Sequence, residues 1–212
     1  MSIYLLKSRF QKLLRPTARF LVRSGLTANI VTVTACLVSF AIGALLIRAP
    51  RQLFAIVPIW MLIRMALNAI DGLMAREFDQ KSPLGAYLNE LSDVLADSAL
   101  YLPFAFVVPF SWRSIGAVIL AATIAEMAGV LGVLAGASRR YDGPMGKSDR
   151  ALVFGILGLA VAVTSELPAW TNTLIWFVVL ALVLTIANRV RGGLRELNSP
   201  KVSPDQQNAI SE

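Results

Sequence analysis

The sequence predicts an all-α protein, an integral membrane bundle of six transmembrane helices preceded by an amphipathic helix at the lipid surface. Of its 212 residues, 56% are hydrophobic and only 16% are charged, whereas soluble domains usually carry about 25% charged residues. Apolar runs near the length that crosses a bilayer recur along the chain. The Lys and Arg residues gather in alternate connections between these runs, as the positive-inside rule describes.

Residues 1–25 form a basic segment that does not resemble a cleaved signal peptide. Its six cationic side chains are spread along the segment instead of preceding one apolar core. Apolar residues recur between them at helical spacing from Leu6 to Leu14. This pattern predicts an amphipathic helix lying on a membrane, which we expect Pro16 to interrupt. A solvated basic arm is the alternative interpretation.

Six apolar segments follow, and each is predicted to be a membrane-spanning helix. The predicted spans are Asn29–Ile47, Leu53–Ile70, Leu84–Val108, Ser114–Ala137, Ala151–Thr164 and Ala169–Ala187. Together they form one domain over residues 26–197. The polar residues 198–212, which contain two prolines, are predicted to form a disordered cytoplasmic tail.

The distribution of cationic residues predicts the orientation in the membrane. Sixteen Lys and Arg lie on the side that holds both termini, and three lie on the opposite side. Both termini are therefore predicted to be cytoplasmic.

The residue types present exclude several kinds of chemistry. The chain has no histidine and a single cysteine, Cys36. A disulfide within the chain, a cysteine-based metal site and a histidine-dependent nucleophile are therefore excluded. Acid–base chemistry falls mainly to Asp and Glu.

Polar residues cluster around the connection between the second and third predicted helices. They are Asn68, Asp71, Asn89, Glu90, Asp93 and Asp97. An acid at mid-membrane depth costs roughly 2.5–3.5 kcal/mol on an insertion scale, and these acids outnumber Arg64, the one cation within a predicted span. At about 100° per residue, the last four of the cluster share one helix face.

Two such faces meeting at a membrane–water boundary predict a site for divalent cations, which favour oxygen ligands. Polar contacts between helices are the alternative, and for Arg64 and Glu126 both interpretations stay open.

The run from Asn68 to Asp93, NAIDGLMAREFDQKSPLGAYLNELSD, resembles the signature of the class-I CDP-alcohol phosphotransferases, D-x2-D-G-x2-A-R-x8-G-x3-D-x3-D. Six of its eight fixed positions match with the correct gaps, and these are Asp71, Gly72, Ala75, Arg76, Gly85 and Asp93. The stretch LTANIVT at 26–32 and the pair Gly146–Lys147 agree more loosely with the family. The resemblance indicates a bacterial inner-membrane branch of this family.

The resemblance implies an enzyme that transfers a substituted phosphate group, in particular phosphatidyl, from a CDP-alcohol such as CDP-diacylglycerol to an acceptor alcohol. CMP is released, and the reaction serves phospholipid biosynthesis. The implied cofactors are one or two Mg²⁺ or Mn²⁺ ions, and the implied general base is Asp93. A homodimer among membrane lipid, without nucleic acid, is also expected.

The resemblance also carries over binding residues. The implied donor contacts are Thr27, Asn29, Gly72, Ala75, Arg76, Ser82 and Gly85. The implied metal ligands are Asn68, Asp71, Asn89 and Asp93.

Two of these ligands depart from the signature, because Asn68 and Asn89 replace its first and third aspartates. An amide carbonyl can ligate a hard cation but supplies no negative charge. We expect Asp97, with Glu90, to supply that charge as additional metal ligands. Altered or lost catalysis is one alternative, and a structural pairing of Asp97 with Arg64 is another.

A basic loop lies on the same side as the cluster. Arg139, Arg140 and Lys147 would hold a phosphate on the acceptor or anchor anionic lipid. A catalytically inactive membrane scaffold and a small-solute transporter are the competing functions.

Overall fold

The computed structural model describes residues 3–198, except for the side chains of residues 3–10, and this part of the chain contains helices and no strand. It has seven α-helices and two 3-10 helices. These are α1 (Ile3–Arg23), α2 (Ala28–Leu46), η1 (Arg51–Ala55), α3 (Ile56–Glu77), α4 (Pro83–Tyr101), η2 (Leu102–Phe106), α5 (Trp112–Leu134), α6 (Lys147–Val163) and α7 (Trp170–Asn198).

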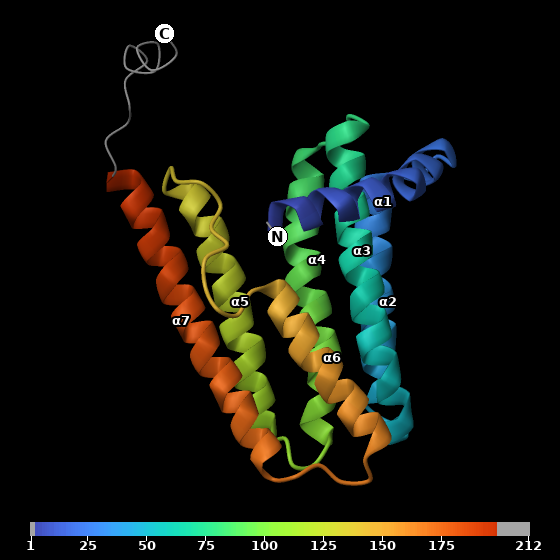
Figure 1. Ribbon diagram of the computed structural model, residues 1–212, viewed down its shortest axis with the longest axis vertical. Coiled ribbons are helices and arrows are strands. Elements are labelled where there is room, and N and C mark those ends of the chain that lie inside the picture. Colours follow the sequence, from blue (N-terminus) through green and yellow to red (C-terminus); the bar gives the residue numbers. More distant parts are fainter. Residues whose placement is uncertain (1–2, 199–212) are drawn as a thin grey trace.

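The helices form a bundle with α1 across one end (Figure 1). α2 packs against α3 and α4, α6 packs against α3, and α5 packs against α7. The α3–α4 connection and the C-terminal end of α7 lie at the end that α1 covers. The α4–α5 and α6–α7 connections lie at the opposite end.

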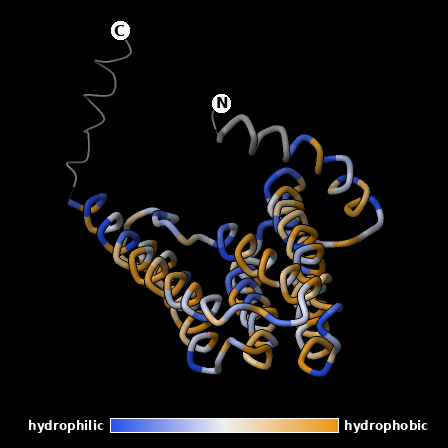
Figure 2. The backbone as a smooth tube through the Cα atoms, turned by 60° about the horizontal axis from the view of Figure 1, so that its bottom comes forward, coloured by the Kyte–Doolittle hydropathy of each residue, from blue (hydrophilic) through white to orange (hydrophobic). Residues whose placement is uncertain are grey.

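Four helical segments of the described chain are long and apolar enough to cross a membrane. They are Ala28–Leu46, Arg51–Glu77, Trp112–Leu134 and Trp170–Asn198. Large apolar side chains such as Leu62, Leu120 and Phe177 are exposed, and Figure 2 shows hydrophobic residues along much of the helical bundle, with hydrophilic residues toward the helix ends. A surface of this kind belongs in lipid. The chain is therefore a multi-pass membrane protein, although α4 and α6, which we also predicted to span, are not among these four segments.

Aromatic packing closes the end of the bundle near η1 and η2. The ring of Tyr101 stacks on Phe154 with centroids 3.8 Å apart, and Phe104 meets both Phe54 and Phe154 edge-on at 5.2 Å. Such pairs contribute about 0.5–1.5 kcal/mol each beyond the area they bury. They hold α4 against α6 at one end, while the polar residues of α4 lie further along the same helix.

The prediction that Pro16 interrupts the first helix is wrong. α1 is continuous from Ile3 to Arg23. Pro16 is exposed, so water can bond the carbonyl that loses its helical partner there.

Three other predicted ends are also wrong. The second predicted helix ends at Glu77 instead of Ile70. The third predicted helix ends at Tyr101 instead of Val108, because Pro103 begins a separate 3-10 turn. The last helix runs to Asn198 instead of ending at Ala187, since hydropathy falls there but no proline breaks the helix. Apart from Asn198, the predicted disordered tail lies outside the described residues.

Close contact between α2 and α4 depends on Gly43. A Cβ atom at this position would lie 2.2 Å from the backbone oxygen of Ala99, so no side chain fits unless the helices separate. We expect Gly43→Val to lower the free energy of unfolding by about 1–3 kcal/mol or more, the usual cost of overpacking. Thermal unfolding in lipid nanodiscs measures this, with Gly116→Val as the control because its Cβ would meet nothing within 4 Å. Equal stability of the two variants would contradict this packing.

Candidate functional site

The two halves of the polar cluster meet at a cavity between α2, α3 and α4. The cavity has a volume of about 660 Å³, within the range of roughly 300–1,000 Å³ usual for small-molecule pockets. Ten of the predicted site residues line it, and these are Asn29, Asn68, Asp71, Gly72, Ala75, Arg76, Ser82, Gly85, Asn89 and Glu90. Sequence positions that are far apart are thus brought to one cavity.

Local sequence places two helix N-termini beside this cavity. Ser82 caps α4, its hydroxyl accepting a hydrogen bond from the Gly85 amide at 3.0 Å, and Pro83 occupies the first turn. Thr27 caps α2 in the same way through the amide of Ile30, although Thr27 itself does not line the cavity. Helix N-termini favour anionic groups because their amides and dipole carry partial positive charge.

Glycine at position 85 lets α2 and α4 approach each other at the cavity. A Cβ at Gly85 would lie 2.8 Å from Asn29 Oδ1. A Cβ at Gly72 would lie 3.1 Å from Arg76 Nη1, so the glycine also leaves room for the Arg76 guanidinium. The geometry of the site therefore explains, on steric grounds, why glycine stands at both of these motif positions.

Sequence reasoning missed three polar residues of the cavity wall, Thr32, Gln80 and Lys81. The Thr32 hydroxyl donates to Asp71 Oδ2 at 2.7 Å, and Gln80 Oε1 accepts from the amide of Ala28 at 2.7 Å. Thr32 was within reach of sequence analysis, because it lies one helical turn beyond Ala28 in an apolar helix. Gln80 offered no such pattern, since its partner is 52 positions away.

Asp93 lies next to the cavity and is held by three groups. Its Oδ1 accepts a hydrogen bond from Asn68 Nδ2 at 2.9 Å and forms an ion pair with Lys147. Arg64 lies 3.7 Å from the same oxygen and donates to the Asp93 backbone carbonyl. Among the described residues, no hydrogen bond is formed to Oδ2, so this oxygen can accept a proton.

Asp97 lies away from the cavity wall, in a buried ion pair. Its Oδ1 accepts from Arg64 Nη1 at 2.5 Å, and its Oδ2 accepts from Arg150 Nη2 at 2.9 Å. Both oxygens therefore have guanidinium partners. This geometry favours the structural pairing over the role of additional metal ligand.

A network of ion pairs continues from Asp97 toward α5 and α7. Glu126 pairs with Arg150 at 3.0 Å and with Arg189 at 3.3 Å. Arg139 pairs with Glu90 and lies 3.7 Å from Glu126. Glu90, a cavity residue, thus connects the cavity to this buried network.

Arg140 points away from the network. It pairs with Asp142 at 2.8 Å and with Glu196 at 2.7 Å. The hydrogen bonds from Arg140 hold the pKa of Asp142 below its usual range, so this loop pair stays charged at neutral pH. Of the three cations of the predicted phosphate site, Lys147 pairs with Asp93 and Arg139 pairs with Glu90 on α4, whereas Arg140 pairs with neither.

The oxygen donors at the cavity fit a hard divalent cation. Asp71 and Glu90 supply carboxylates, and Asn68 and Asn89 supply amide carbonyls. The described residues contain no group of three or more Asp, Glu, Cys or His side chains placed to hold a metal. Any ion bound here would therefore depend on amide or backbone oxygens, which suits Mg²⁺ and Mn²⁺ chemically but provides less charge.

Comparison with known proteins decides the family. A family model described as CDP-alcohol phosphatidyltransferase matches residues 25–189, which include the whole cavity. The chain belongs to the CDP-alcohol phosphatidyltransferase family. The resemblance drawn from the Asn68–Asp93 motif is confirmed, and with it membership of a family of membrane transferases that use divalent metal ions.

Relatives agree with this assignment, and solved structures share the fold. The inner membrane protein YnbA of Escherichia coli is 47% identical over 197 residues, which cover 92% of this chain and 97% of that protein. The phosphatidylinositol phosphate synthase of Mycobacterium tuberculosis is 27% identical and covers 88% of each chain. The structure of that synthase with manganese and citrate has a TM-score of 0.72 at 20% identity, covering 90% of this chain and 93% of that one. Its structure with CDP-DAG has a TM-score of 0.69, covering 91% and 99%.

Proposed function

We propose that this protein transfers a phosphatidyl group from CDP-diacylglycerol to an acceptor alcohol, releasing CMP. The observation that carries the proposal is the cavity between α2, α3 and α4, because the matched motif residues line it beside two helix N-termini. The solved relative with CDP-DAG supports the choice of donor.

The cavity suits the cytidine and pyrophosphate of such a donor. Arg76 offers a planar fork to a phosphate, and Lys81 adds a second positive charge on the wall. Gly72, Ala75 and Gly85 leave space for close approach of the nucleotide. The helix N-termini capped by Thr27 and Ser82 attract the phosphates of the donor, and Asn29 lies in the first turn of α2.

A Mg²⁺ or Mn²⁺ ion is part of this proposal. Asn68, Asp71, Asn89 and Asp93 would hold it, while the pairing of Glu90 with Arg139 leaves Glu90 a lesser contributor. When bound, such an ion neutralises charge on the pyrophosphate and on the departing CMP. The relative crystallised with manganese supports this assignment.

Asp93 is the proposed general base. The acceptor hydroxyl oxygen bonds to the phosphorus that carries the diacylglycerol, and the bond from that phosphorus to the bridging oxygen of CMP breaks. The hydroxyl proton passes to Asp93 Oδ2, and CMP leaves with the bonding electron pair. Lys147 and Asn68 fix the carboxylate through Oδ1, so the other oxygen is available for the proton.

A groove between α3 and α6 supports a lipid donor. It has a volume of about 300 Å³ and is lined by apolar residues from Pro58 to Met65 on α3 and from Ala151 to Leu159 on α6. Ser148 also lines it, next to Lys147, and Met65 lies one helical turn from Asn68. An acyl chain in this groove would therefore start close to the reacting phosphate.

We expect Ala151→Phe, which fills this groove, to raise KM for CDP-diacylglycerol by roughly tenfold, about the effect of losing one or two buried methylene contacts. A water-soluble CDP-alcohol that lacks acyl chains should show an unchanged KM. Val163→Phe is the matched control because Val163 is exposed at the far end of α6. Equal effects on both donors, or no effect on either, would reject the acyl-chain groove and leave a soluble donor as the better choice.

The membrane arrangement extends this proposal. We propose that α2 to α7 all span the bilayer, with α1 on the cytoplasmic surface and both termini in the cytoplasm of a bacterium. In support, Ala18 on α1 is buried while Leu13 and Phe20 on the same helix are exposed, as for a helix that docks on one face and meets lipid with another. The predicted domain limits and homodimer stay predictions.

A further inference from the structure

We infer that Glu126 makes the acceptor side of this site selective for an alcohol that carries no phosphate group. The inference rests on the proposed phosphatidyl transfer and names its class of acceptor. The acceptor hydroxyl must reach Asp93, and beyond the donor cavity Asp93 contacts Lys147 and Arg64. The cations next to these belong to the Glu126 network.

Glu126 is arranged as an internal anion for three arginines from three parts of the chain. Arg150 on α6 donates to its Oε1 at 3.0 Å, and Arg189 on α7 donates to its Oε2 at 3.3 Å. Arg139, from the α5–α6 connection, lies 3.7 Å from Oε2. Several guanidinium groups converging on one group of oxygens is how proteins bind phosphate. Here a carboxylate of the chain itself takes that place.

The remaining donors of these arginines do not open a second phosphate site. Arg139 also pairs with Glu90, and Arg150 also pairs with Asp97. The donors Arg139 Nε, Arg150 Nε, Arg150 Nη1 and Arg189 Nε lack hydrogen-bond partners in the described part of the chain, but protein atoms enclose them. A phosphate could therefore use these guanidinium groups only by displacing Glu126.

The charges of the network are nearly balanced without a ligand. Its cations are Arg64, Arg139, Lys147, Arg150 and Arg189, and its acids are Glu90, Asp93, Asp97 and Glu126. A phosphate dianion added beside Glu126 would be repelled in a region of low dielectric constant. An alcohol without phosphate brings no such repulsion, and its hydroxyl groups can bond both the guanidinium and the carboxylate groups.

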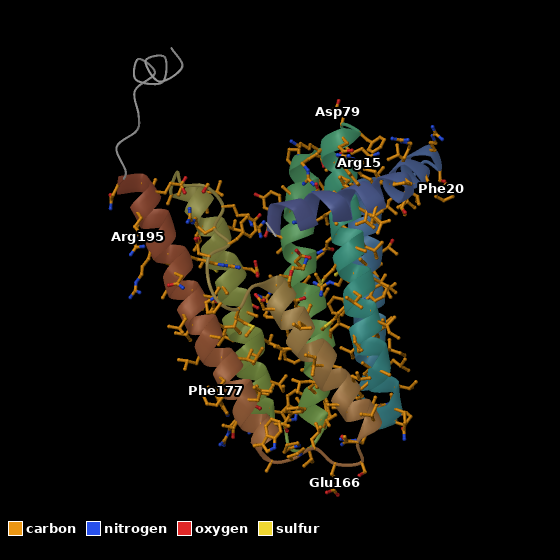
Figure 3. All side chains as sticks on the ribbon, in the orientation of Figure 1. Arg15, Phe20, Asp79, Glu166, Phe177 and Arg195 are labelled. Atoms are coloured by element: carbon orange, nitrogen blue, oxygen red, sulfur yellow. The ribbon has the colours of Figure 1, made fainter. Side chains whose placement is uncertain are left out.

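Two measurements on the full-length protein in phosphatidylcholine nanodiscs test this inference. The first is calorimetric titration with inorganic phosphate while CMP saturates the donor cavity. We expect Glu126→Gln to bind phosphate at least tenfold more tightly than wild type, which is about 1.4 kcal/mol. Glu166→Gln should bind as wild type does, because Glu166 is an exposed acid in the α6–α7 connection at the opposite end of the bundle (Figure 3).

The second measurement compares wild-type CMP release with matched acceptors, glycerol against glycerol 3-phosphate and inositol against inositol 1-phosphate. The unphosphorylated member of at least one pair should react faster. Faster reaction with both phosphorylated members, or phosphate binding by wild type as tight as by Glu126→Gln, would overturn the inference. The wild-type comparison decides even where Glu126→Gln does not fold. If phosphate binds to the variants as expected but CMP is released with none of the acceptors, only the proposed transfer is rejected.

Discussion

Replacing Asp93 by Asn is expected to lower the rate of CMP release by about 10²–10⁴-fold, the usual contribution of a general base. The amide keeps the size of the carboxylate but cannot take the acceptor proton at the position of Oδ2. The contacts of Oδ1 with Asn68 and Lys147 should hold the substituted side chain in place. The rate of labelled CMP release from CDP-diacylglycerol in nanodiscs measures this effect.

Asp79→Asn is the matched control for this substitution. Asp79 is exposed in the α3–α4 connection and does not line the cavity, so its neutralisation should leave the rate within about twofold of wild type. Thermal unfolding should show that both variants fold. A rate for Asp93→Asn within threefold of wild type would remove Asp93 from the role of general base.

Replacing Asp97 by Asn is expected to destabilise the protein by about 3–5 kcal/mol, because it removes the carboxylate charge that pairs with two buried guanidinium groups. Arg64 and Arg150 both lose an ion pair to Asp97. Arg150 keeps Glu126 at 3.0 Å, whereas the carboxylate contact that Arg64 keeps is the longer one of 3.7 Å with Asp93. Arg64→Leu in the same chain should therefore restore part of the lost stability. Thermal unfolding in nanodiscs measures both variants.

The same variants decide between the two interpretations of Asp97. If Asp97 only forms structural ion pairs, Asp97→Asn should lower stability and leave the Mg²⁺ or Mn²⁺ concentration for half-maximal activity unchanged. If Asp97 instead replaces the charge missing at Asn68 and Asn89, Asp97→Asn should raise the metal concentration for half-maximal activity, and Asn89→Asp should partly reverse that change. An altered metal requirement at unchanged stability would contradict the assignment made from the ion pairs.

The sequence predicted the helical class, the membrane character and most of the polar residues that line the cavity between α2, α3 and α4. The cavity was predictable because the residues of the family motif lie on two helices joined by a short connection, and this connection brings Asp71, Gly85 and Asn89 together. Helix ends were predicted less accurately where the chain becomes polar but stays helical, as after Ala187.

Apart from the Asp97–Arg64 pair, which was one of the alternatives, the ion network escaped prediction because its partners come from distant parts of the chain. The predicted fifth span begins at Ala151, which places Lys147 and Arg150 in a cytoplasmic loop. The acids within the predicted spans therefore outnumbered the cations there. In the structure α6 begins at Lys147 and Arg150 is buried, so both reach the acids of α4. That pairing, 53 to 54 positions apart, leaves no local pattern in the sequence.

The most direct test of the central claim is to follow the products of wild-type protein. Purified chain in nanodiscs is incubated with CDP-diacylglycerol carrying separate labels on the cytidine and the glycerol, a mixture of acceptor alcohols, and Mg²⁺ or Mn²⁺. We predict that labelled CMP and a new labelled phospholipid appear in equal amounts, and that a chelator or Asp71→Asn abolishes both. Intact CDP-diacylglycerol after prolonged incubation with every acceptor and either ion would contradict the claim.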